Sequence, residues 1–271
     1  MTELKADFRS VILAGERPGG SPLSLAFNVP ASVMVPVAGK PALARVMQAI
    51  DESQFVEGGV ICGPAAEIVA NSKKIKNLLL LHPDHEWLDQ STGPAASASS
   101  ALEKLNHYPV LLTAGDHALL TGKIVDEFCS RVLSCCAGDT KPDLVIGFVP
   151  YPLVKAAWPQ SRRTVLKFSN GQFCGSNLFA IVNPQGRKAL SFWRQAEADR
   201  KQPWRIARRV GFVALIRYLF KCVTIEETLV HLSKAAGCHI GYIQLNEARA
   251  AVDVDSIEDQ KLAESILSGK S

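Results

Sequence analysis

Short apolar runs alternate with helical stretches through the first half of the chain, and this alternation restricts the fold more than any other feature. We predict strands at residues 10–14, 58–62, 78–82 and 109–113, with helices at residues 39–50, after Pro64 and at residues 94–105. Strands separated by helices are typical of βαβ units and a largely parallel sheet. Ligands bind such sheets beyond the carboxyl ends of the strands, so functional residues are expected in the loops that follow them.

The second half of the chain departs from this alternation. Strands are predicted at residues 143–149, at 164–168 and 176–182 around a turn at Asn170-Gly171, and at 239–245, before a last helix at 256–267. A loop rich in Pro and Trp is expected after residue 149. Residues 184–236 are helical and basic in pattern. We therefore predict an α/β fold in one domain, residues 1–271, with a basic helical insertion at about 184–236.

The composition narrows the class of protein. With 271 residues, of which 47% are hydrophobic and 21% charged, the chain can bury a core and is neither disordered nor fibrous. Seven cysteines without a CxxC spacing indicate reduced thiols rather than a disulfide or zinc framework. The first residues lack an apolar signal segment, and the apolar stretch at 210–223 is shorter than the roughly 20 residues that cross a bilayer. We expect a cytoplasmic protein, and a net charge of +4 does not indicate a nucleic-acid partner.

The loop after the first strand is a candidate phosphate site. Its sequence, Leu13-Ala-Gly-Glu-Arg-Pro-Gly-Gly20, combines three glycines with one arginine. Backbone N–H groups and a guanidinium bind phosphate oxygens well. The loop is neither a Walker A motif nor GxGxxG. Taken alone, it is equally consistent with an ordinary glycine-rich turn.

Four later segments give this loop a context. They are Val35-Pro-Val-Ala-Gly-Lys-Pro41, Thr92-Gly-Pro-Ala-Ala-Ser-Ala-Ser-Ser-Ala-Leu102, Thr113-Ala-Gly-Asp-His-Ala-Leu-Leu-Thr121 and Val252-Asp-Val-Asp-Ser-Ile-Glu-Asp-Gln-Lys-Leu-Ala-Glu264. In this order, the five segments resemble the motifs of the MobA-like NTP transferases, nucleotidyltransferases of GT-A fold. The resemblance spans residues 11–264. It implies a Rossmann-like three-layer α/β/α fold with a mostly parallel mixed sheet.

The resemblance also implies nucleotide-binding and metal-binding residues. In the family, the loop that matches residues 13–20 holds the NTP phosphates, and the segment that matches residues 92–102 contacts the nucleobase. Two aspartates bind Mg²⁺. The matching nucleotide-binding residues are Leu13, Ala14, Gly15, Arg17, Gly93 and Pro94, and the matching metal ligands are Asp116 and Asp255. Arg17 and Asp116 are the candidate catalytic residues. Nucleotidyl transfer places negative charge on phosphate oxygens, which Mg²⁺ held by carboxylates neutralises.

Helix capping is the alternative interpretation of both aspartates. Asp116 could cap the helical segment after Thr121, although its distance from that helix is poor for a cap. Asp255 or Ser256 could cap the last helix, with Glu258 or Asp259 completing a capping box. Asp253 is the alternative metal ligand.

One position departs from the family pattern. Members of the family carry a lysine just before the Gly-Lys-Pro segment, where its charge neutralises the phosphates, and the matching residue here is Ser32. No lysine occurs between Lys5 and Lys40, and Arg17 replaces the charge only in part. Because such cations stabilise the transition state, a slow enzyme, an enzyme with a relocated cation and a binding-only relative all remain open.

The acceptor site is predicted in outline. The resemblance places Lys167, Gly175, Ser176 and Asn177 near the acceptor, and the basic Arg162 and Arg163 lie close by in the sequence. These charges suit a phosphorylated or acidic acceptor. A tight hairpin with solvated charges is the competing interpretation. Cys174 has no activating histidine at a recognisable spacing, which favours a structural thiol.

The predicted insertion contains basic residues interleaved with tryptophan. They include Trp193, Arg194, Trp204, Arg205 and Arg217, followed by Lys221. Contact with a membrane surface and a lipid-linked acceptor is one interpretation. Docking on its own domain, a homodimer face and arginines that snorkel from a core helix are the others.

Three histidines are possible metal ligands or site residues. His82 and His85 lack a third metal ligand, so a loop role is favoured over a metal site. His117 follows Asp116 closely enough to reach the reaction centre, but the sequence assigns it no role.

The sequence therefore predicts a Mg²⁺-dependent nucleotidyltransferase that moves NMP from an NTP to an acidic acceptor and releases pyrophosphate. A catalytically impaired, nucleotide-binding relative is the first alternative, because of Ser32. A GT-A glycosyltransferase is the second, but it would prefer a D-x-D motif where Asp116 is followed by His117 and Ala118. No nucleic-acid partner is expected.

Overall fold

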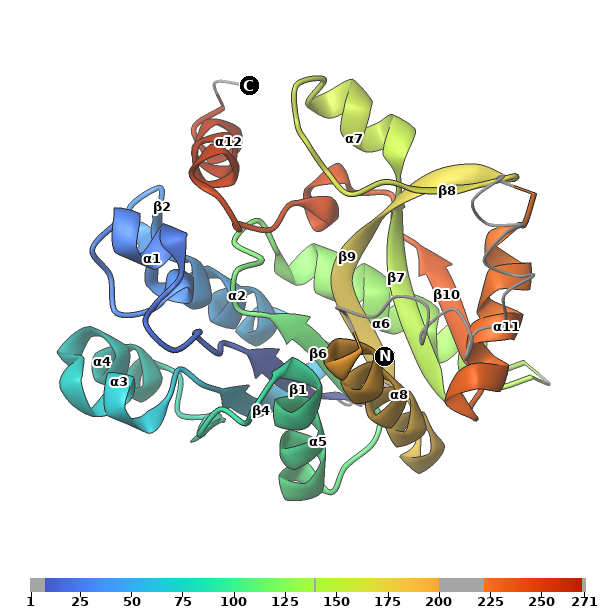
Figure 1. The fold of residues 1–271 in the computed structure, drawn as a ribbon, viewed down its shortest axis with the longest axis horizontal. Helices are drawn as coiled ribbons and strands as arrows, with labels where there is room; N and C mark the ends of the chain where they lie inside the picture. The colour runs from blue at the N-terminus through green and yellow to red at the C-terminus, as the bar shows by residue number, and fades with distance from the viewer. Residues whose placement is uncertain (1–7, 139, 200–221, 270–271) are drawn as a thin grey trace.

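A single eight-stranded sheet runs through the computed structural model, which describes residues 8–138, 140–199 and 222–269 (Figure 1). Its strands are β1 (Phe8–Leu13), β4 (Val56–Cys62), β5 (His85–Leu88), β6 (Val110–Ala114), β7 (Leu144–Pro150), β8 (Leu166–Phe168), β9 (Gly171–Ile181) and β10 (Ile240–Gln244). The spatial order is β10-β7-β9-β6-β1-β4-β5, with β8 paired to β9. β9 is antiparallel to β6, β7 and β8, whereas the other neighbouring pairs are parallel. The predicted mostly parallel mixed sheet is confirmed.

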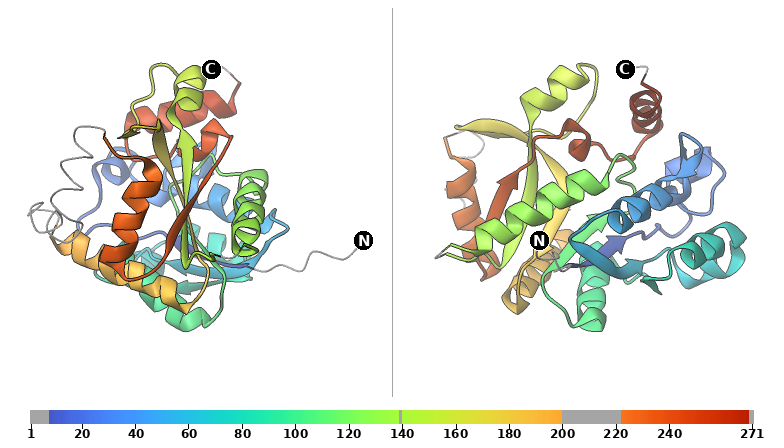
Figure 2. Two further views of the ribbon diagram at one scale, coloured as in Figure 1. Left: turned by 90° about the vertical axis from the view of Figure 1, so that its right-hand side faces the viewer. Right: turned by 180° about the vertical axis from the view of Figure 1, so that it is seen from behind.

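Helices cover both faces of this sheet. The helices α2 (Ala42–Asp51), α4 (Lys73–Leu81) and α6 (Gly122–Cys136) contribute to one buried cluster, while α5 (Pro94–Leu105), α8 (Arg187–Ala198) and α11 (Ile225–Ala236) contribute to another. Figure 2 shows helices on either side of the sheet when it is viewed along its edge. Because both faces are covered, the central strands are apolar almost throughout, as in β1, where Val11 pairs with Val60 and Leu112. The predicted three-layer α/β/α fold is confirmed.

The remaining elements, except η2, lie at the carboxyl ends of the parallel strands. They are α1 (Pro22–Ala26), the 3₁₀ turn η1 (Ser32–Met34), the small hairpin β2 (Pro36–Val37) and β3 (Lys40–Pro41), α3 (Ala66–Asn71), α7 (Tyr151–Ala157), the 3₁₀ turn η3 (Ala248–Ala251) and α12 (Ile257–Leu267). The 3₁₀ turn η2 (Pro184–Gly186) precedes α8. A third apolar cluster, which includes Leu23, Val37 and Ile266, joins α1 and β2 to α12. Segments from the two ends of the sequence therefore meet beside the site.

One predicted strand was wrong. Residues 78–82, predicted as a strand, belong mostly to α4, and the third parallel strand is β5. The run of four leucines resembles a buried strand, but only Leu78 is buried, while Leu80 and Leu81 are 78% and 76% exposed. One-sided burial is the pattern of an amphipathic helix. Ser72 begins this helix by accepting a hydrogen bond from the Ile75 backbone N–H.

Two predicted boundaries also change. The helix predicted from residue 39 begins at Ala42, because Lys40 and Pro41 form β3, in which Lys40 pairs with Val37. The segment after residue 149, predicted as a loop, forms α7. Pro152 lies in the first turn of that helix, where a missing N–H costs no hydrogen bond.

The described parts of the predicted insertion are helical, as expected. α8 packs along α5, and the rings of Trp193 and Phe179 stack with centroids 6.5 Å apart. This part of the segment therefore docks on its own domain. Trp204, Arg205, Arg217 and Lys221 lie outside the described residues, so the membrane and homodimer interpretations stay predictions, as does the division of the chain into a domain and an insertion.

Candidate functional site

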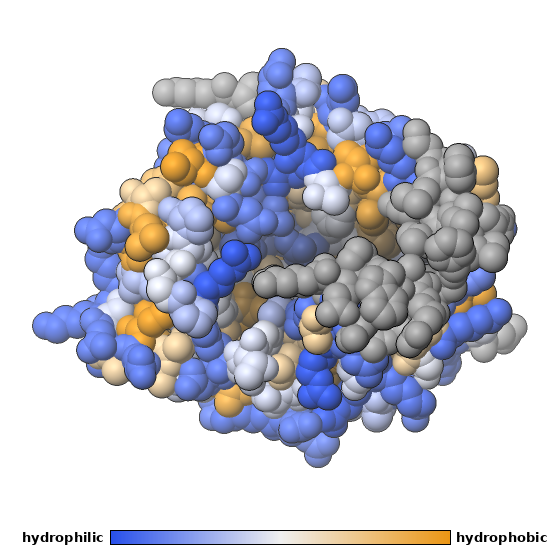
Figure 3. Space-filling view, viewed as in Figure 1, coloured by the Kyte–Doolittle hydropathy of each residue, from blue (hydrophilic) through white to orange (hydrophobic). Residues whose placement is uncertain are grey.

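The loops that follow β1, β4, β5 and β6 meet at one edge of the sheet, because these four strands are parallel. The Gly115 N–H donates to the Leu13 carbonyl at 2.8 Å, which joins the loop after β6 to the loop after β1. Gly63 has a φ of +88°, and a Cβ there would lie 2.9 Å from the Gly15 Cα. The backbones are thus packed closely around the predicted phosphate loop. Figure 3 shows the surface hollowed near the centre of this face and lined there by hydrophilic residues.

Gln90 fixes the phosphate loop to the segment after β5. Its Oε1 accepts from the Glu16 backbone N–H and its Nε2 donates to the Glu16 carbonyl, each at 2.8 Å. These two bonds hold Gln90 beside Glu16, and a Cβ added to Gly15 would lie 3.3 Å from the Gln90 Oε1. Gln90 was not predicted as a site residue, because the third strand was expected at residues 78–82. The alternating segment His85-Glu-Trp-Leu88 was the signal that could have located the strand and the loop behind it.

Glu16 places a carboxylate inside this loop. Its Oε1 accepts from the Arg17 N–H at 2.9 Å, its Oε2 accepts from the Ser32 N–H, and the residue is only 6% exposed. Ser32 therefore lies against the loop that is predicted to bind phosphate. In this arrangement, two backbone amides near the expected phosphate position are bonded to a negative side chain of the chain itself.

Asp116 follows β6 and is held by its backbone. Its carbonyl accepts from Ala118 N–H at 2.8 Å and from Val254 N–H at 3.1 Å. Its Oδ1 is buried and has no hydrogen-bond partner among the described residues. Burial, together with the charges of Asp253 and Asp255, raises the pKa of Asp116 to about 7. Such a carboxyl group requires a proton or a cation in order to be stable.

Neither aspartate serves as a helix cap. Thr121 caps α6 by accepting from the Ile124 N–H at 3.3 Å, and Ser256 caps α12 by accepting from the Asp259 N–H at 3.2 Å. Asp116 and Asp255 therefore have no capping role that would account for them.

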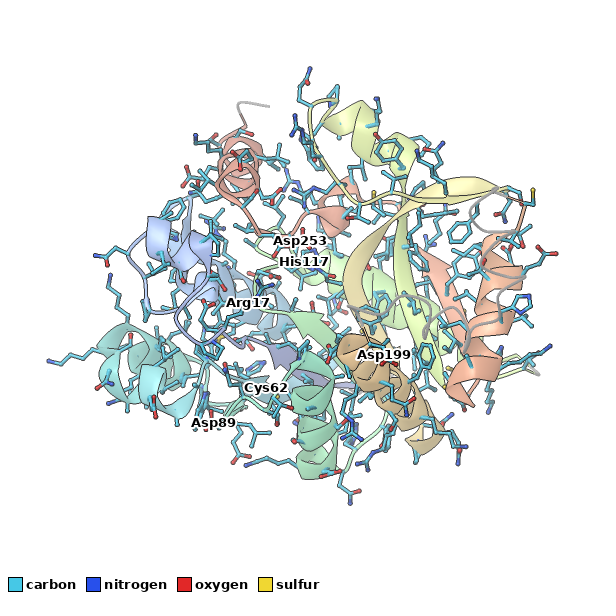
Figure 4. All side chains as sticks on the ribbon, viewed as in Figure 1. Arg17, Cys62, Asp89, His117, Asp199 and Asp253 are labelled. Carbon is cyan, nitrogen blue, oxygen red and sulfur yellow. The ribbon has the colours of Figure 1, made fainter. Side chains whose placement is uncertain are left out.

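Asp255 lies between acidic and basic neighbours. Burial raises its pKa, Asp253 raises it as well, and the guanidinium groups of Arg163 and Arg17 oppose the shift. Arg17 and Asp255, which are 238 positions apart in the sequence, thus face the same space. In Figure 4, Arg17, His117 and Asp253 lie together near the centre of the view.

Asp253 is engaged by two side chains. Arg163 Nη1 donates to its Oδ1 at 2.6 Å, and Asn177 Nδ2 donates to its Oδ2 at 2.9 Å. Arg163 also pairs with Asp259. Asn177 has a φ of +52°, an uncommon conformation that asparagine tolerates better than most residues. Because both oxygens of Asp253 are used, Asp255 is the freer partner for Asp116.

A polar pocket of about 380 Å³ adjoins these carboxylates. It is lined by Arg162, Arg163, Thr164, Leu166, Cys174, Gly175, Asn177, Ala251, Asp253, Asp255 and Asp259. Of the predicted acceptor residues, Gly175 and Asn177 line it. The Ser176 hydroxyl instead donates to the Gly147 carbonyl at 2.8 Å in the core, and Lys167 is exposed on β8, outside the lining. Arg162 and Arg163, which were expected near the acceptor, line the same pocket as three aspartates, Asp253, Asp255 and Asp259.

The carboxylates suit a magnesium ion, although they form no complete metal cage. In the described part of the chain, no group of three or more His, Cys, Asp or Glu is arranged to hold a metal ion. Mg²⁺ is commonly bound by one or two carboxylates together with substrate phosphates and waters. The unpartnered Oδ1 of Asp116, with Asp255 nearby, fits that donor set.

The remaining candidates lie around this site or apart from it. Burial lowers the pKa of His117 to about 4, and burial raises the pKa of Cys174 to about 11, so His117 is neutral and Cys174 is a thiol near pH 7. His82 and His85 flank Asp51 on another part of the fold, with Nδ1 atoms 2.5 Å and 3.5 Å from its carboxylate oxygens.

Comparisons with known proteins agree with this architecture. Residues 30–148 match the family model of the MobA-like NTP transferase domain. The resemblance drawn from the motifs is thereby confirmed over this range. No curated protein sequence gives a significant match. No helix in the described residues has the length and apolar character needed to cross a lipid bilayer.

Solved structures extend the similarity to nearly the whole chain. A hypothetical transferase from Thermus thermophilus shares 26% identity and superimposes with a TM-score of 0.73, covering 93% of this chain and 98% of its own. CMP:2-keto-3-deoxy-manno-octonic acid synthetase complexed with CTP gives a TM-score of 0.60 at 11% identity, covering 98% of this chain and 100% of its own. 4-Diphosphocytidyl-2C-methyl-D-erythritol synthase from Anaerococcus prevotii gives 0.57 at 10% identity, covering 96% of each chain. At these low identities, the last two comparisons show the shared fold.

Proposed function

We propose that this protein is a nucleotidyltransferase that transfers NMP from an NTP to a phosphorylated or acidic acceptor, with Mg²⁺ as cofactor. The observation that carries the proposal is the convergence of Arg17, Asp116 and Asp255 from three distant segments beside an arginine-lined pocket. A cation, two carboxylates and an adjoining polar pocket match what a reaction between two negatively charged substrates requires.

The nucleotide half of the site is assigned to the loop after β1 and the start of α5. Backbone groups of Leu13, Ala14 and Gly15 face the phosphates, and the Arg17 guanidinium neutralises part of their charge. Gly93 and Pro94 lie under the nucleobase. The Gln90 clamp on Glu16 supports this assignment, because it fixes the two segments relative to each other.

Asp116 and Asp255 are assigned as the residues that hold Mg²⁺. When bound, the ion neutralises phosphate charge and stabilises the leaving pyrophosphate. The buried, unpartnered Oδ1 of Asp116 supports its role as a ligand. Arg163 and Asn177 keep Asp253 oriented and thereby shape the acidic side of the site.

The acceptor is assigned to the polar pocket. The exposed Arg162 offers its guanidinium group to a phosphate or carboxylate, and Asn177 and Gly175 line the same space. Arg163 is paired with Asp253 and Asp259 and holds these carboxylates in place beside the acceptor. An acceptor oxygen attacks the α-phosphorus of the NTP, the bond to the bridging α–β oxygen breaks, and pyrophosphate leaves with that oxygen. The fold shared with a CTP-bound sugar-acid synthetase supports an acidic acceptor, free or lipid-linked.

Pyrophosphate release tests the proposal. Purified protein with Mg²⁺ is assayed with each of the four NTPs and a panel of sugar phosphates, sugar acids and polyprenyl phosphates. We expect pyrophosphate from one NTP–acceptor pair, dependent on Mg²⁺ and lost in Asp116→Asn. Absence of turnover, together with absence of Mg²⁺-dependent NTP binding, would exclude this function. Hydrolysis of sugar nucleotides but not NTPs would instead indicate a glycosyltransferase.

A catalytically impaired, nucleotide-binding relative is the second candidate, and Ser32 with its Glu16 contact favours it. Here the protein binds NTP in the absence of appreciable transfer. Ser32→Lys would then raise pyrophosphate release at least about 10-fold, because it restores a cation beside the phosphates. A native protein that already turns over at ordinary enzymatic rates would refute this alternative.

A further inference from the structure

Helix α8 brings a carboxylate to the start of α5. A Cβ added to Gly93 would lie 3.1 Å from Glu197 Oε2 and 3.9 Å from Glu197 Cδ. The side chain of Glu197 therefore lies directly against the Gly93 backbone, although the two residues are 104 positions apart in the sequence.

The packing of two helices fixes this contact. Arg187, the first residue of α8, pairs with Glu103 near the end of α5 at 2.8 Å, whereas Glu197 near the end of α8 reaches Gly93, the N-cap of α5. The two helices are thus antiparallel and in register over their whole length. The stacked Trp193 and Phe179 rings anchor α8 between these two points. The position of Glu197 follows from the docking of the entire helix.

The Gly93 segment is itself held in place. Gln90 ties it to Glu16 in the phosphate loop, and the Ser91 N–H donates to Ser97 Oγ at 2.9 Å. Thr92 and Pro94 are exposed and accessible to a ligand. A carboxylate thus borders a fixed, accessible strip of backbone next to the phosphate loop.

We infer that Glu197 is a specificity residue that selects NTPs whose base carries an exocyclic amino group. This inference rests on the proposed function, which places the base at Gly93. An ionised carboxylate only accepts hydrogen bonds, and it pairs with the amino donors of guanine, cytosine or adenine. Uracil presents carbonyl oxygens at the corresponding positions, so a carboxylate there repels it.

Binding of the four NTPs, measured by equilibrium titration with Mg²⁺, tests this inference independently of turnover. The native protein should bind an amino-bearing NTP more tightly than UTP. Glu197→Gln keeps the size of the side chain but replaces one acceptor oxygen with a donor, and it should lower that preference roughly 5-fold or more. Glu57→Gln neutralises a glutamate that is exposed near the start of β4, at the other end of that strand from the candidate site, so this variant should bind NTPs as the native protein does.

Base analogues locate the contact at one group. If GTP is the preferred nucleotide, inosine triphosphate lacks only its 2-amino group and should bind the native protein as weakly as GTP binds Glu197→Gln. For CTP or ATP, the analogue without the 4-amino or 6-amino group serves in the same way. The affinity for the analogue should be the same in Glu197→Gln as in the native protein.

Two results would overturn the inference alone, namely a preference for UTP or an equal change in the affinity of all four NTPs in Glu197→Gln. Absence of NTP binding by the native protein would overturn the proposed function as well.

Discussion

The proposed site has two halves, one assigned to the nucleotide and one to the acceptor, and they differ in the atoms that form them. The nucleotide half, formed by the loops after β1, β4, β5 and β6, consists mainly of backbone atoms in close contact, such as Gly63 against Gly15. The acceptor half, formed by β9, the loop before β8 and residues 252–259, consists of charged side chains such as Arg163 and Asp253 that pair with one another. The first half depends on local shape, and the second depends on charges brought from distant segments. Substitutions that alter shape or charge separately can test this difference.

The largest effect is expected where the two halves meet. Asp116→Asn removes the carboxylate that we propose holds Mg²⁺, and we expect transfer to fall about 100- to 1,000-fold. The rate of pyrophosphate release at saturating substrate measures this loss. Asp84→Asn removes an exposed carboxylate outside the site and serves as the control. A rate that is unchanged in Asp116→Asn would show that the carboxylate does not take part in the reaction.

Charge removal in the acceptor half should cost stability. Arg163→Ala leaves Asp253 and Asp259 without their shared partner, and the guanidinium side chain is only 7% exposed. We expect the free energy of unfolding to fall by about 3 kcal/mol, measured by urea denaturation. Arg9→Ala removes an exposed pair with Glu57 and should cost less than about 1 kcal/mol. Equal losses in the two variants would mean that the Arg163 network does not support the fold.

Shape change in the nucleotide half should also cost stability. Gly63→Ala combines a positive φ with a Cβ 2.9 Å from Gly15, and we expect a loss of about 2–3 kcal/mol together with weaker NTP binding. Gly19→Ala has a similar φ of +83° but no atom within 4 Å of the added Cβ, so about 1 kcal/mol is expected. Thermal unfolding of both variants isolates the cost of the contact. If both variants lose the same free energy of unfolding, the close contact between Gly63 and Gly15 does not contribute to stability.

The smallest effect concerns the pH dependence of stability at His85, which lies beside Asp51 and His82. Burial lowers the pKa of His85, the charges of Asp51 and Asp84 oppose the shift, and His82 adds to it. Below pH 6.5, the unfolded chain therefore binds a proton that the folded chain does not, so stability should fall as the pH drops from 7 to 5. One proton changes stability by at most about 1.4 kcal/mol per pH unit.

His85→Gln isolates this contribution. Urea denaturation at several pH values should give a shallower fall for the variant than for the native protein. An identical slope in both proteins would show that His85 does not contribute to the pH dependence.

The same division explains what the sequence could reveal. The helix predicted at residues 94–105 has those bounds as α5, because Pro94 and the apolar spacing that follows are local signals. Gly15, Asp116 and Asp255 were found through motifs that stand in the sequence as continuous segments. By contrast, the pairing of Arg163 with Asp253, 90 positions later, depends on the order of strands in the sheet. No local pattern specifies such a pair.

The strand misplaced at residues 78–82 shows the same limit within the first half. A run of leucines suits a buried strand and an amphipathic helix alike, and only tertiary packing decides between them. Because β5 was not predicted, Gln90, which follows it, was not expected at the edge of the sheet where ligands bind. The contact between Glu197 and Gly93 was likewise not predictable from the sequence, because the two residues lie about a hundred positions apart.

The docking of α12 on the β2–β3 hairpin has a consequence for synthesis on the ribosome. Gln260 Nε2 donates to the Pro36 carbonyl at 2.9 Å, and the Ala38 N–H donates to Glu264 Oε1 at 3.3 Å, so Asp255 is positioned by contacts between early and late segments. A nascent chain that has released only its first 150 residues can arrange the loop around Gly15 but lacks Asp255 and Arg163. An emerging chain therefore contains the segments assigned to the nucleotide half before it contains Arg163 and Asp255. Ribosome-bound intermediates of this protein should be chemically silent until the segment that carries α12 leaves the exit tunnel.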